Sequence, residues 1–425
     1  MNKKVVILNN GLRAILCRTN NKGIVRMALQ ILQGSMHEKD DNNGISHMLE
    51  HIISACFKEG ALCRKLWMRG AQMTATTRKS HTSYVIDGLA DYLDLYMQVL
   101  SQMIFNPPEI TPELLKKEKN VILCEQDSYY SSLNQIQDRC IQALFGDRNI
   151  GRMILGKRKN IKTFDINSLL ELHRSSYRPN NSVLVIYGDI NLDEATVLVE
   201  EYFGLYKSVD SYTLKVEDVS DTPTHYFNAN ANGEYGVISI GHRIKTDSDF
   251  TIMECALMIL LAAHTNPMLT YRTAYELRIK QGMTYSIGGF IKNSGDTYCT
   301  GVSVVVKNTD IIPAIRIIVE NIKQIRDNGL GEEELLRLIA FNKFQMLYSW
   351  NDFSKRSQAE INYALENGEH SYERKLECFE TLTVNRLHAL FYQFLSEADS
   401  SIACIGAFDR DEIINEYKNA WKGVM

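Results

Sequence analysis

The sequence predicts an α+β fold of two tandem homologous domains, each a mostly antiparallel sheet with helices packed on one face. Two pairs of segments indicate the duplication. Residues 163–177 resemble residues 381–395, and residues 182–194 resemble residues 400–412. Both pairs share one offset of 218 positions (381 − 163 and 400 − 182), which argues against coincidence. In each copy, moreover, grouped strand-like runs are interrupted by pairs of helical segments, which is typical of an α+β layer.

The first copy opens with a predicted β-hairpin. Apolar runs from Val5 to Leu8 and from Leu12 to Leu16 flank Asn9-Asn10-Gly11, and turn residues between two such runs are typical of a hairpin. Pro112 marks the first turn of a long helix, where proline loses no hydrogen bond. The strands expected in this copy are residues 4–8, 12–17, 26–33, 82–88 and 182–187, and the long helix covers residues 112–137.

The second copy has the same mixture of strands and helices. Its expected strands are residues 235–240, 285–291, 298–306 and 401–405, and its expected helices are residues 248–263, 309–327 and 332–348. The polar stretch 208–224 is interpreted as the linker. The predicted domains are therefore residues 1–207 and 225–425.

Composition excludes several classes of protein. The chain has 425 residues, 45% of them hydrophobic, which supplies ample core. Its formal net charge of −4 gives no electrostatic footprint for nucleic acid. The longest apolar run, Cys255 to Ala263, cannot span a bilayer, so no membrane partner is expected. Nine cysteines scattered without C-x-x-C pairs favour a reducing cytosol, and the N-terminal apolar run is too short for a signal peptide.

One five-residue motif carries chemistry. Residues 47–51 read His-Met-Leu-Glu-His, and on a helix His47 and His51 share one face and direct two imidazoles at one point. Glu50 lies beside them. Two neutral imidazoles suit zinc, and an adjacent carboxylate suits a general base that acts on water activated by the metal. The string is the H-x-x-E-H signature of inverzincin metallopeptidases. The alternative is a helix with two surface histidines and an exposed glutamate.

A catalytic zinc site needs a third protein ligand from elsewhere in the chain. Glu118 and Glu125 lie seven residues apart on the predicted helix, so they share one face. Glu125 follows the apolar run 121–123, and a carboxylate near a core-facing stripe is costly to bury unless it is paired or bound to metal. An ordinary charged helix face remains the alternative for both residues.

These motifs resemble the pitrilysin or insulinase family of zinc metallopeptidases. The size of the chain is similar to the short, dimer-forming branch of that family, which includes mitochondrial processing peptidase subunits and bacterial homologues. Further stretches carry the resemblance along nearly the whole chain: residues 10–12, 34–35, 43–51, 57–60, 106–107, 121–125, 151–156, 177–181 and 188–189.

The resemblance implies roles for individual residues. It implies that His47, His51 and Glu125 bind Zn²⁺, since the family's third ligand falls about 75 residues beyond the second histidine. Glu118 matches the family's supporting glutamate, which orients a ligand imidazole.

In the second half, Arg278 and Tyr285 match a family pair with six residues between them. The resemblance implies that this pair contacts substrate and stabilises the transition state. A guanidinium or a tyrosine hydroxyl suits that task because both can donate hydrogen bonds to an oxyanion.

The expected function is a zinc-dependent endopeptidase that hydrolyses short or unfolded peptides in a clamshell chamber formed by two chains. The chain carries both the metal motif and the Arg–Tyr pair, so a homodimer is favoured, although some relatives are heterodimers. Two alternatives remain: an inactive partner or scaffold subunit, and a dedicated leader-peptide maturation protease.

Two departures from the family pattern concern substrate preference. Thr74 stands where the family's edge strand, which receives substrate, usually has asparagine. Residues 264–267, His-Thr-Asn-Pro, replace a turn that is often rich in glycine. His264 could be a spare metal ligand, but a loop histidine is far more often structural or solvated, so a metal-binding role is disfavoured.

Overall fold

The chain folds into two compact units that interleave along the sequence. The computed structural model describes residues 2–208, 216–219, 222–229, 233–246, 248–294, 297–365 and 372–423. The first unit comprises Met1–Asp127, Arg152–Glu217 and Trp350–Glu369, and the second comprises Ser128–Gly151, Asp218–Ser349 and His370–Met425. One short segment of each half of the sequence, residues 128–151 and residues 350–369, thus belongs to the unit formed mainly by the other half. Most of the expected linker, residues 209–215 and 220–221, lies outside the described residues.

The first unit is built on a six-stranded sheet. Its strands are β1 (Asn2–Ile7), β2 (Arg13–Arg18), β3 (Ile24–Ile31), β4 (Gln72–Thr77), β5 (Thr82–Leu89) and β6 (Ser182–Gly188). Their order is β1-β2-β6-β3-β5-β4, and every neighbouring pair is antiparallel except β2 and β6. The predicted hairpin is confirmed, because β1 pairs with β2 from Asn2 opposite Arg18 to Ile7 opposite Arg13. Strand β4 forms one edge of the sheet.

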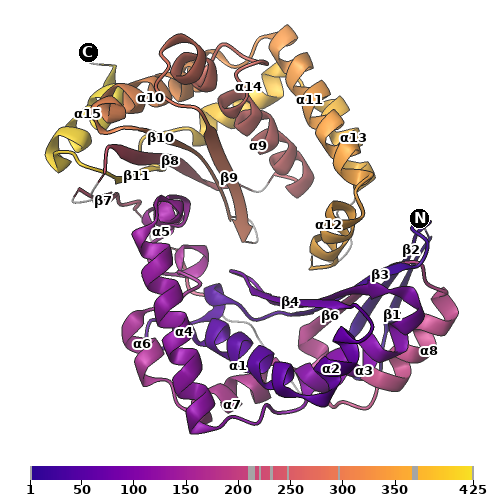
Figure 1. Cartoon of the computed structure of the whole chain (residues 1–425). Helices are drawn as coiled ribbons and strands as arrows, with labels where there is room; N and C mark the ends of the chain where they lie inside the picture. Colours follow the sequence, from indigo (N-terminus) through magenta and orange to yellow (C-terminus); the bar gives the residue numbers. More distant parts are fainter. Residues whose placement is uncertain are drawn as a thin grey trace. The chain divides into compact units, whose positions relative to one another are not determined.

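Helices cover one face of this sheet (Figure 1). They are α1 (Ile45–Glu59), α2 (Ala61–Trp67), α3 (Leu93–Phe105), α4 (Pro112–Ser131), α6 (Arg158–Thr163), α7 (Ile166–Ser176) and α8 (Leu192–Phe203). Ile52, Leu100 and Ile186 lie in the core between the two layers, fully buried. Burying each such side chain stabilises the fold by roughly 1.5–3 kcal/mol. On the opposite face, α12 (Phe353–Leu365) packs Ile361 against the sheet.

The second unit repeats this plan. Its sheet has the order β7-β11-β8-β10-β9, and β7 and β11 form its parallel pair. The strands are β7 (Tyr226–Asn228), β8 (Tyr235–Lys245), β9 (Ile287–Ser294), β10 (Thr297–Lys307) and β11 (Ser400–Ile405). The helices are α9 (Phe250–Thr265), α10 (Ile311–Asn328), α11 (Glu332–Trp350), α13 (Tyr372–Thr381), α14 (Val384–Phe394) and α15 (Arg410–Lys422), with α5 (Ile136–Phe145) on the other face. The expected α+β fold with two homologous domains is confirmed.

Two details differ from the expectations. The helix predicted over residues 112–137 ends at Ser131, because Ser132 is extended and its hydroxyl caps a short turn by accepting from the Asn134 N–H. The chain then starts α5, which packs on the second sheet. Each sheet also carries one helix on the face that was expected to be bare. None of the helices in the described parts of the chain combines the length and apolar character needed to cross a membrane.

Candidate metal centre

The H-x-x-E-H motif lies near the start of α1, and a buried carboxylate holds that start in place. Glu38 Oε2 accepts hydrogen bonds from the Gly44 N–H and the Asn43 Nδ2, both at 2.8 Å, and Oε1 accepts from the Ser46 N–H at 2.9 Å. These bonds satisfy N–H groups that a helix start leaves without partners. Burial nevertheless raises the pKa of Glu38. In the sequence, Glu38 is distinguished only as an acidic residue shortly before the helix, which does not predict this capping role.

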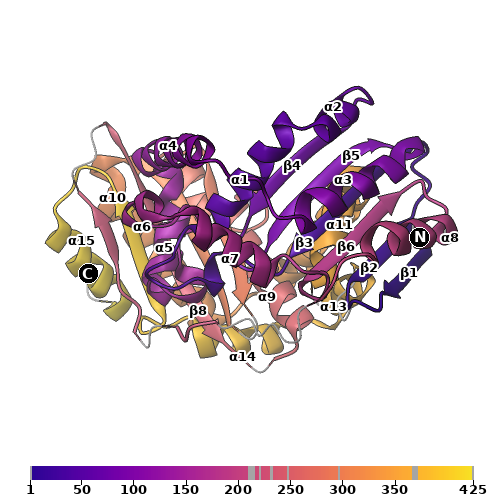
Figure 2. The ribbon, with the colours of Figure 1, turned by 90° about the horizontal axis from the view of Figure 1, so that it is seen from below.

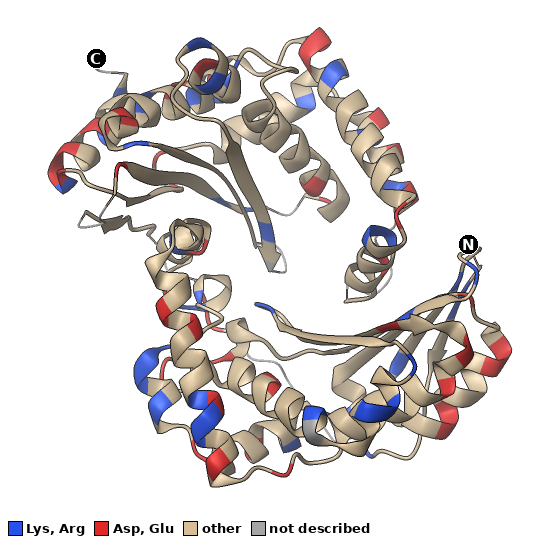
Figure 3. Ribbon diagram, in the orientation of Figure 1, with Lys and Arg blue, Asp and Glu red and all other residues tan. Residues whose placement is uncertain are grey.

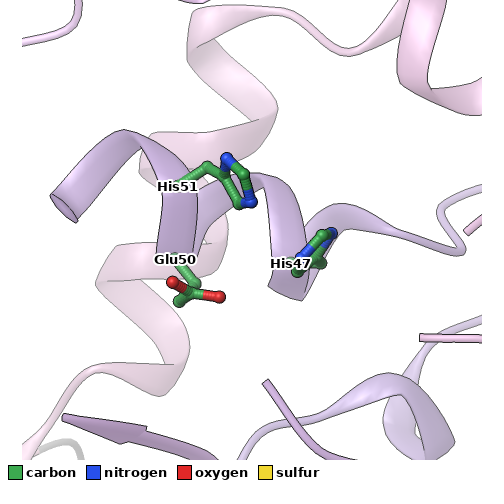
Figure 4. Close-up of side chains that lie close together, drawn as sticks. All are labelled: His47, Glu50 and His51. Carbon is green, nitrogen blue, oxygen red and sulfur yellow. The ribbon is translucent and has the colours of Figure 1, made fainter. Parts of the chain in front are cut away.

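The three motif side chains lie together on α1 (Figure 4). One ligand atom from each of His47, Glu50 and His51 falls within 4.8 Å of the others. The two imidazole rings have centroids 4.6 Å apart and meet edge to face at 73°. The i, i+4 spacing of the histidines therefore brings both rings to one point, as the sequence predicts.

Glu125 and Glu118 approach this point from α4, which lies beside α1 (Figure 2). Glu125 Oε2 is 3.7 Å from His47 Nε2 and 3.6 Å from His51 Nε2. Glu118 Oε2 lies 3.2 Å from the other nitrogen of His51, Nδ1. The two carboxylates therefore meet opposite edges of the same imidazole, and the structure brings all five of these predicted residues together.

The arrangement is compatible with zinc. Ligand atoms around a tetrahedral zinc with bonds of about 2.0–2.1 Å lie about 3.3–3.4 Å apart, close to the distances between Glu125 and the two Nε2 atoms. Both distances are longer than a good hydrogen bond. Glu125 Oε2 and the two Nε2 atoms therefore do not satisfy one another by direct hydrogen bonding. Residues His47, His51 and Glu125 thus form a donor set that fits the ion.

Burial and charge set the protonation of the cluster. Burial, followed by the charge of His51, lowers the pKa of His47 to about 4, which favours the neutral imidazole that binds metals. Burial also works to lower the pKa of His51, but Glu125 and the other carboxylates outweigh it and raise that pKa. The contact with His51 lowers the pKa of Glu125.

Glu50 lies on a cavity beside the histidines. The Thr77 hydroxyl, at the end of β4, donates a hydrogen bond of 3.3 Å to Glu50 Oε2. The cavity of about 480 Å³ is lined by residues of α1, β4 and α4, including Glu50 and His51. Burial raises the pKa of Glu50 above its ordinary value. Thr77 was not singled out in the sequence, because a hydroxyl on a threonine-rich strand has no distinctive pattern.

Two expectations about α4 are wrong in detail. The buried face of α4 consists of Leu115, Glu118, Ile122 and Gln126. The Glu125 side chain is 44% exposed. The cost of burying a carboxylate, from which the sequence favoured Glu125 as a metal ligand, therefore does not apply to it. The sequence also predicts a core position for Cys124, the residue next to Glu125, but Cys124 is exposed.

A glycine contact fixes the separation of α1 and α4. Gly156 packs directly on Gly44, so closely that a Cβ at position 156 would lie 2.4 Å from the Gly44 Cα. Gln126, next to Glu125 on α4, donates from Nε2 to the carbonyl oxygens of Leu155 at 2.7 Å and Gly156 at 3.0 Å. The segment 155–156 therefore touches both helices that carry the metal-facing side chains.

Gly156→Ala is expected to lower the free energy of unfolding by about 3 kcal/mol. The added methyl group would overlap the Gly44 backbone, and the φ of +73° already disfavours a side chain. Urea denaturation measures the loss. Gly70→Ala is the matched control, because Gly70 has a φ of +69° but nothing within 4 Å of its Cβ position. Equal losses in the two variants would contradict a role for the close contact.

Arg278 and Tyr285 lie in the second unit. Arg278 belongs to a π-helical turn, Tyr275–Lys280, and Tyr285 precedes β9. The guanidinium carbon lies 4.8 Å from the centroid of the Tyr285 ring, within the range of a cation–π interaction. The Tyr285 side chain is exposed and borders a cavity of about 710 Å³ in that unit. His264, at the end of α9, is buried and bonded through Nδ1 to the Thr273 hydroxyl at 2.8 Å.

The fold and the site together are those of a two-domain α+β protein with a candidate zinc centre. Residues 13–158 match the family described as Insulinase (Peptidase family M16), and residues 163–341 match the Peptidase M16 inactive domain. The chain belongs to peptidase family M16, the insulinase family.

Individual relatives agree with this assignment. The chain is 23% identical over 410 residues to a protein of Bacillus subtilis (strain 168) described as an uncharacterized zinc protease, covering 93% of this chain and 96% of that protein. A crystal structure of a protease from Helicobacter pylori has the same fold, with a TM-score of 0.84 at 16% identity, covering 95% of this chain and 99% of the other. The periplasmic protease PqqL of Escherichia coli matches with a TM-score of 0.76 at 17% identity, covering 98% of this chain and 50% of the longer PqqL chain.

Proposed function

We propose that this protein is a zinc endopeptidase whose metal is held by His47, His51 and Glu125. The observation that carries the proposal is the approach of Glu125 Oε2 to both Nε2 atoms, at 3.7 and 3.6 Å. When bound, zinc supplies a Lewis acid that lowers the pKa of water and polarises a peptide carbonyl. Glu118 fixes the orientation of His51 by accepting a hydrogen bond from its Nδ1.

Glu50 is the proposed general base. Its carboxylate takes a proton from the attacking water and returns that proton to the leaving amine. The hydrogen bond from Thr77 holds one carboxylate oxygen, and the cavity that Glu50 lines provides space for substrate. A raised pKa suits this double role, because the group must accept a proton and then release it near neutral pH.

Zinc analysis and peptide hydrolysis test the proposal. The purified chain is expected to contain zinc and to cleave internal bonds in a mixed peptide library, with the products identified by mass spectrometry. A chelator should stop cleavage, and added zinc should restore it. A chain that binds no zinc and cleaves no peptide under any of these conditions would rule the proposal out.

Short or unfolded peptides are the proposed substrates. Strand β4 ends its sheet, so its outer backbone groups are open to a further strand, and Glu50 is bonded to Thr77 on this strand. An extended peptide can add to such an edge through main-chain hydrogen bonds. Thr74 is exposed on β4, and its hydroxyl is available where relatives usually have asparagine.

The active form is proposed to be a homodimer in which Arg278 and Tyr285 of one chain face the metal of its partner. The support is that this chain matches half the length of PqqL, and that it carries both the metal motif and the Arg–Tyr pair. Mixing inactive Glu50→Gln chains with inactive Tyr285→Phe chains should restore activity, because one of the two sites in a mixed dimer is intact. Failure of a verified mixed dimer to recover activity would exclude shared sites.

Two other functions are alternatives to the proposed endopeptidase. An inactive partner subunit would bind peptides without cleaving them, and the complete H-x-x-E-H motif argues against this role. A leader-peptide maturation protease would use the same chemistry on a narrower substrate. A cytoplasmic location belongs to the proposal as well, supported by the nine scattered cysteines.

A further inference from the structure

The cavity beside Glu50 and His51 combines apolar walls with two ammonium groups. Its volume is about 480 Å³. The apolar part consists of Ala55 on α1, Met73 and Ala75 on β4, and Val121 on α4. The cations are Lys58 on α1 and Lys117 on α4, and both residues are exposed. The two helices that carry the proposed metal ligands, α1 and α4, thus each contribute one lysine to the cavity.

The acids of the same cavity already have partners. Glu118 lies 3.2 Å from His51 Nδ1, and Glu50 accepts from the Thr77 hydroxyl at 3.3 Å. Lys58 and Lys117 differ from them, because neither forms an ion pair with any described side chain. Basic residues are frequent along α4 and α6 (Figure 3), but others in this region, such as Arg158 with Asp127, are paired with acids. Lys58 and Lys117 thus line the cavity and have no ion-pair partner among the described side chains.

The position of the cavity relates it to an added substrate strand. Along β4, residues 73 and 75 face the cavity, whereas residues 72, 74 and 76 are exposed. Successive side chains of a strand point to opposite faces, so a peptide paired with β4 directs every second side chain towards this cavity. One of those side chains would pass the apolar wall and reach the two ammonium groups.

We propose that this cavity binds a carboxylate of the substrate, next to the bond that is cleaved. The carboxylate comes from an aspartate or glutamate side chain, or from the C-terminus of a short peptide. Apolar walls accommodate the methylene groups, and Lys58 and Lys117 pair with the charge. This inference rests on the proposed peptidase function and names its substrate class, acidic peptides.

A matched set of peptides tests the inference. Quenched peptides with an amidated C-terminus carry Glu, Gln or Lys at one position near the cleaved bond, and each position is varied in turn. A second set has Gln at every varied position and a free C-terminus. At one position, kcat/KM for the Glu peptide should exceed that for the Gln peptide by about tenfold, since two exposed ion pairs each contribute a few-fold. If the carboxylate is C-terminal, the free-acid peptide should show the advantage instead.

Variants assign the preference to the two lysines. In the double variant Lys58→Gln/Lys117→Gln, the ratio of kcat/KM between acidic and neutral peptides should fall close to one. Lys116→Gln is the control, because Lys116 is an exposed lysine on α4 that does not line the cavity, and it should keep the ratio. Zinc content is measured for each variant, so that loss of metal is recognised.

The outcomes separate this inference from the function on which it rests. Equal cleavage of acidic and neutral peptides, or an acid preference that survives in the double variant, would overturn the inference and leave the peptidase intact. A wild-type chain that cleaves none of the peptides and holds no zinc would overturn both. An acid preference that disappears in the double variant and persists in Lys116→Gln supports the inference.

Discussion

Glu50→Gln is expected to lower kcat by about a hundred- to ten-thousandfold while the zinc content stays at the wild-type level. Glutamine has the size of glutamate, and its carbonyl oxygen can still accept the hydrogen bond from Thr77. The amide cannot take a proton from water, so the step assigned to Glu50 is lost. The proposed ligands His47, His51 and Glu125 are unchanged, and the metal should therefore remain. Metal analysis and single-turnover hydrolysis of a quenched peptide measure the two effects.

The zinc content of this variant also separates two roles for Glu50. Its carboxylate lies within 4.8 Å of both histidine ligand atoms, so a direct role as a ligand is the competing explanation. If Glu50 were a ligand, the variant would lose metal together with activity. Glu113→Gln, on the exposed first turn of α4, serves as the control and should behave like the wild type. Substantial turnover by Glu50→Gln would remove Glu50 from the mechanism.

Replacing the two carboxylates of α4 is expected to give graded losses of zinc. Glu118→Gln should weaken zinc binding by about 10- to 100-fold, because residues that orient a ligand imidazole typically have effects of this size. Glu125→Gln removes the only charged group among the three proposed ligands, so the variant should lose its metal during dialysis and with it all activity. Competition with a chromophoric chelator measures the affinities, and hydrolysis is followed in the presence of excess zinc.

The order of these two effects is the informative result. Glu118 is buried and contacts His51 Nδ1, whereas Glu125 is half-exposed and faces both Nε2 atoms. A greater loss of zinc in Glu118→Gln than in Glu125→Gln would reverse the proposed roles. Circular dichroism of both variants shows whether α4 keeps its structure, since the buried Glu118 also contributes to packing.

Local periodicity explains why the sequence could predict much of the site. The spacing of His47, Glu50 and His51 fixes their common face once residues 45–59 form a helix, and the pairing of β1 with β2 follows from a short turn between two apolar runs. The partnership of Glu125 with the histidines could not be obtained in this way. It was expected because of the resemblance to a known family, as were the positions of Arg278 and Tyr285.

Contacts between distant segments account for what the sequence did not reveal. Glu38 caps α1, Gly156 packs on Gly44, and Gln126 bonds to residues 155 and 156, yet none of the three has a distinctive local pattern. The same holds for α5 and α12, each of which packs on the sheet of the other half of the sequence. Their apolar faces predict burial but do not specify which sheet they cover.

The sequence by itself determined the repeated α+β domains and the two imidazoles on one helix face, because helix and strand periods depend only on neighbouring residues. The tertiary structure alone decided how far Glu125 lies from those imidazoles, and that Lys58 and Lys117 border one cavity. Such distances depend on close packing between α1, α4 and the segment 155–156, and packing is a property of surfaces that meet only in the folded chain.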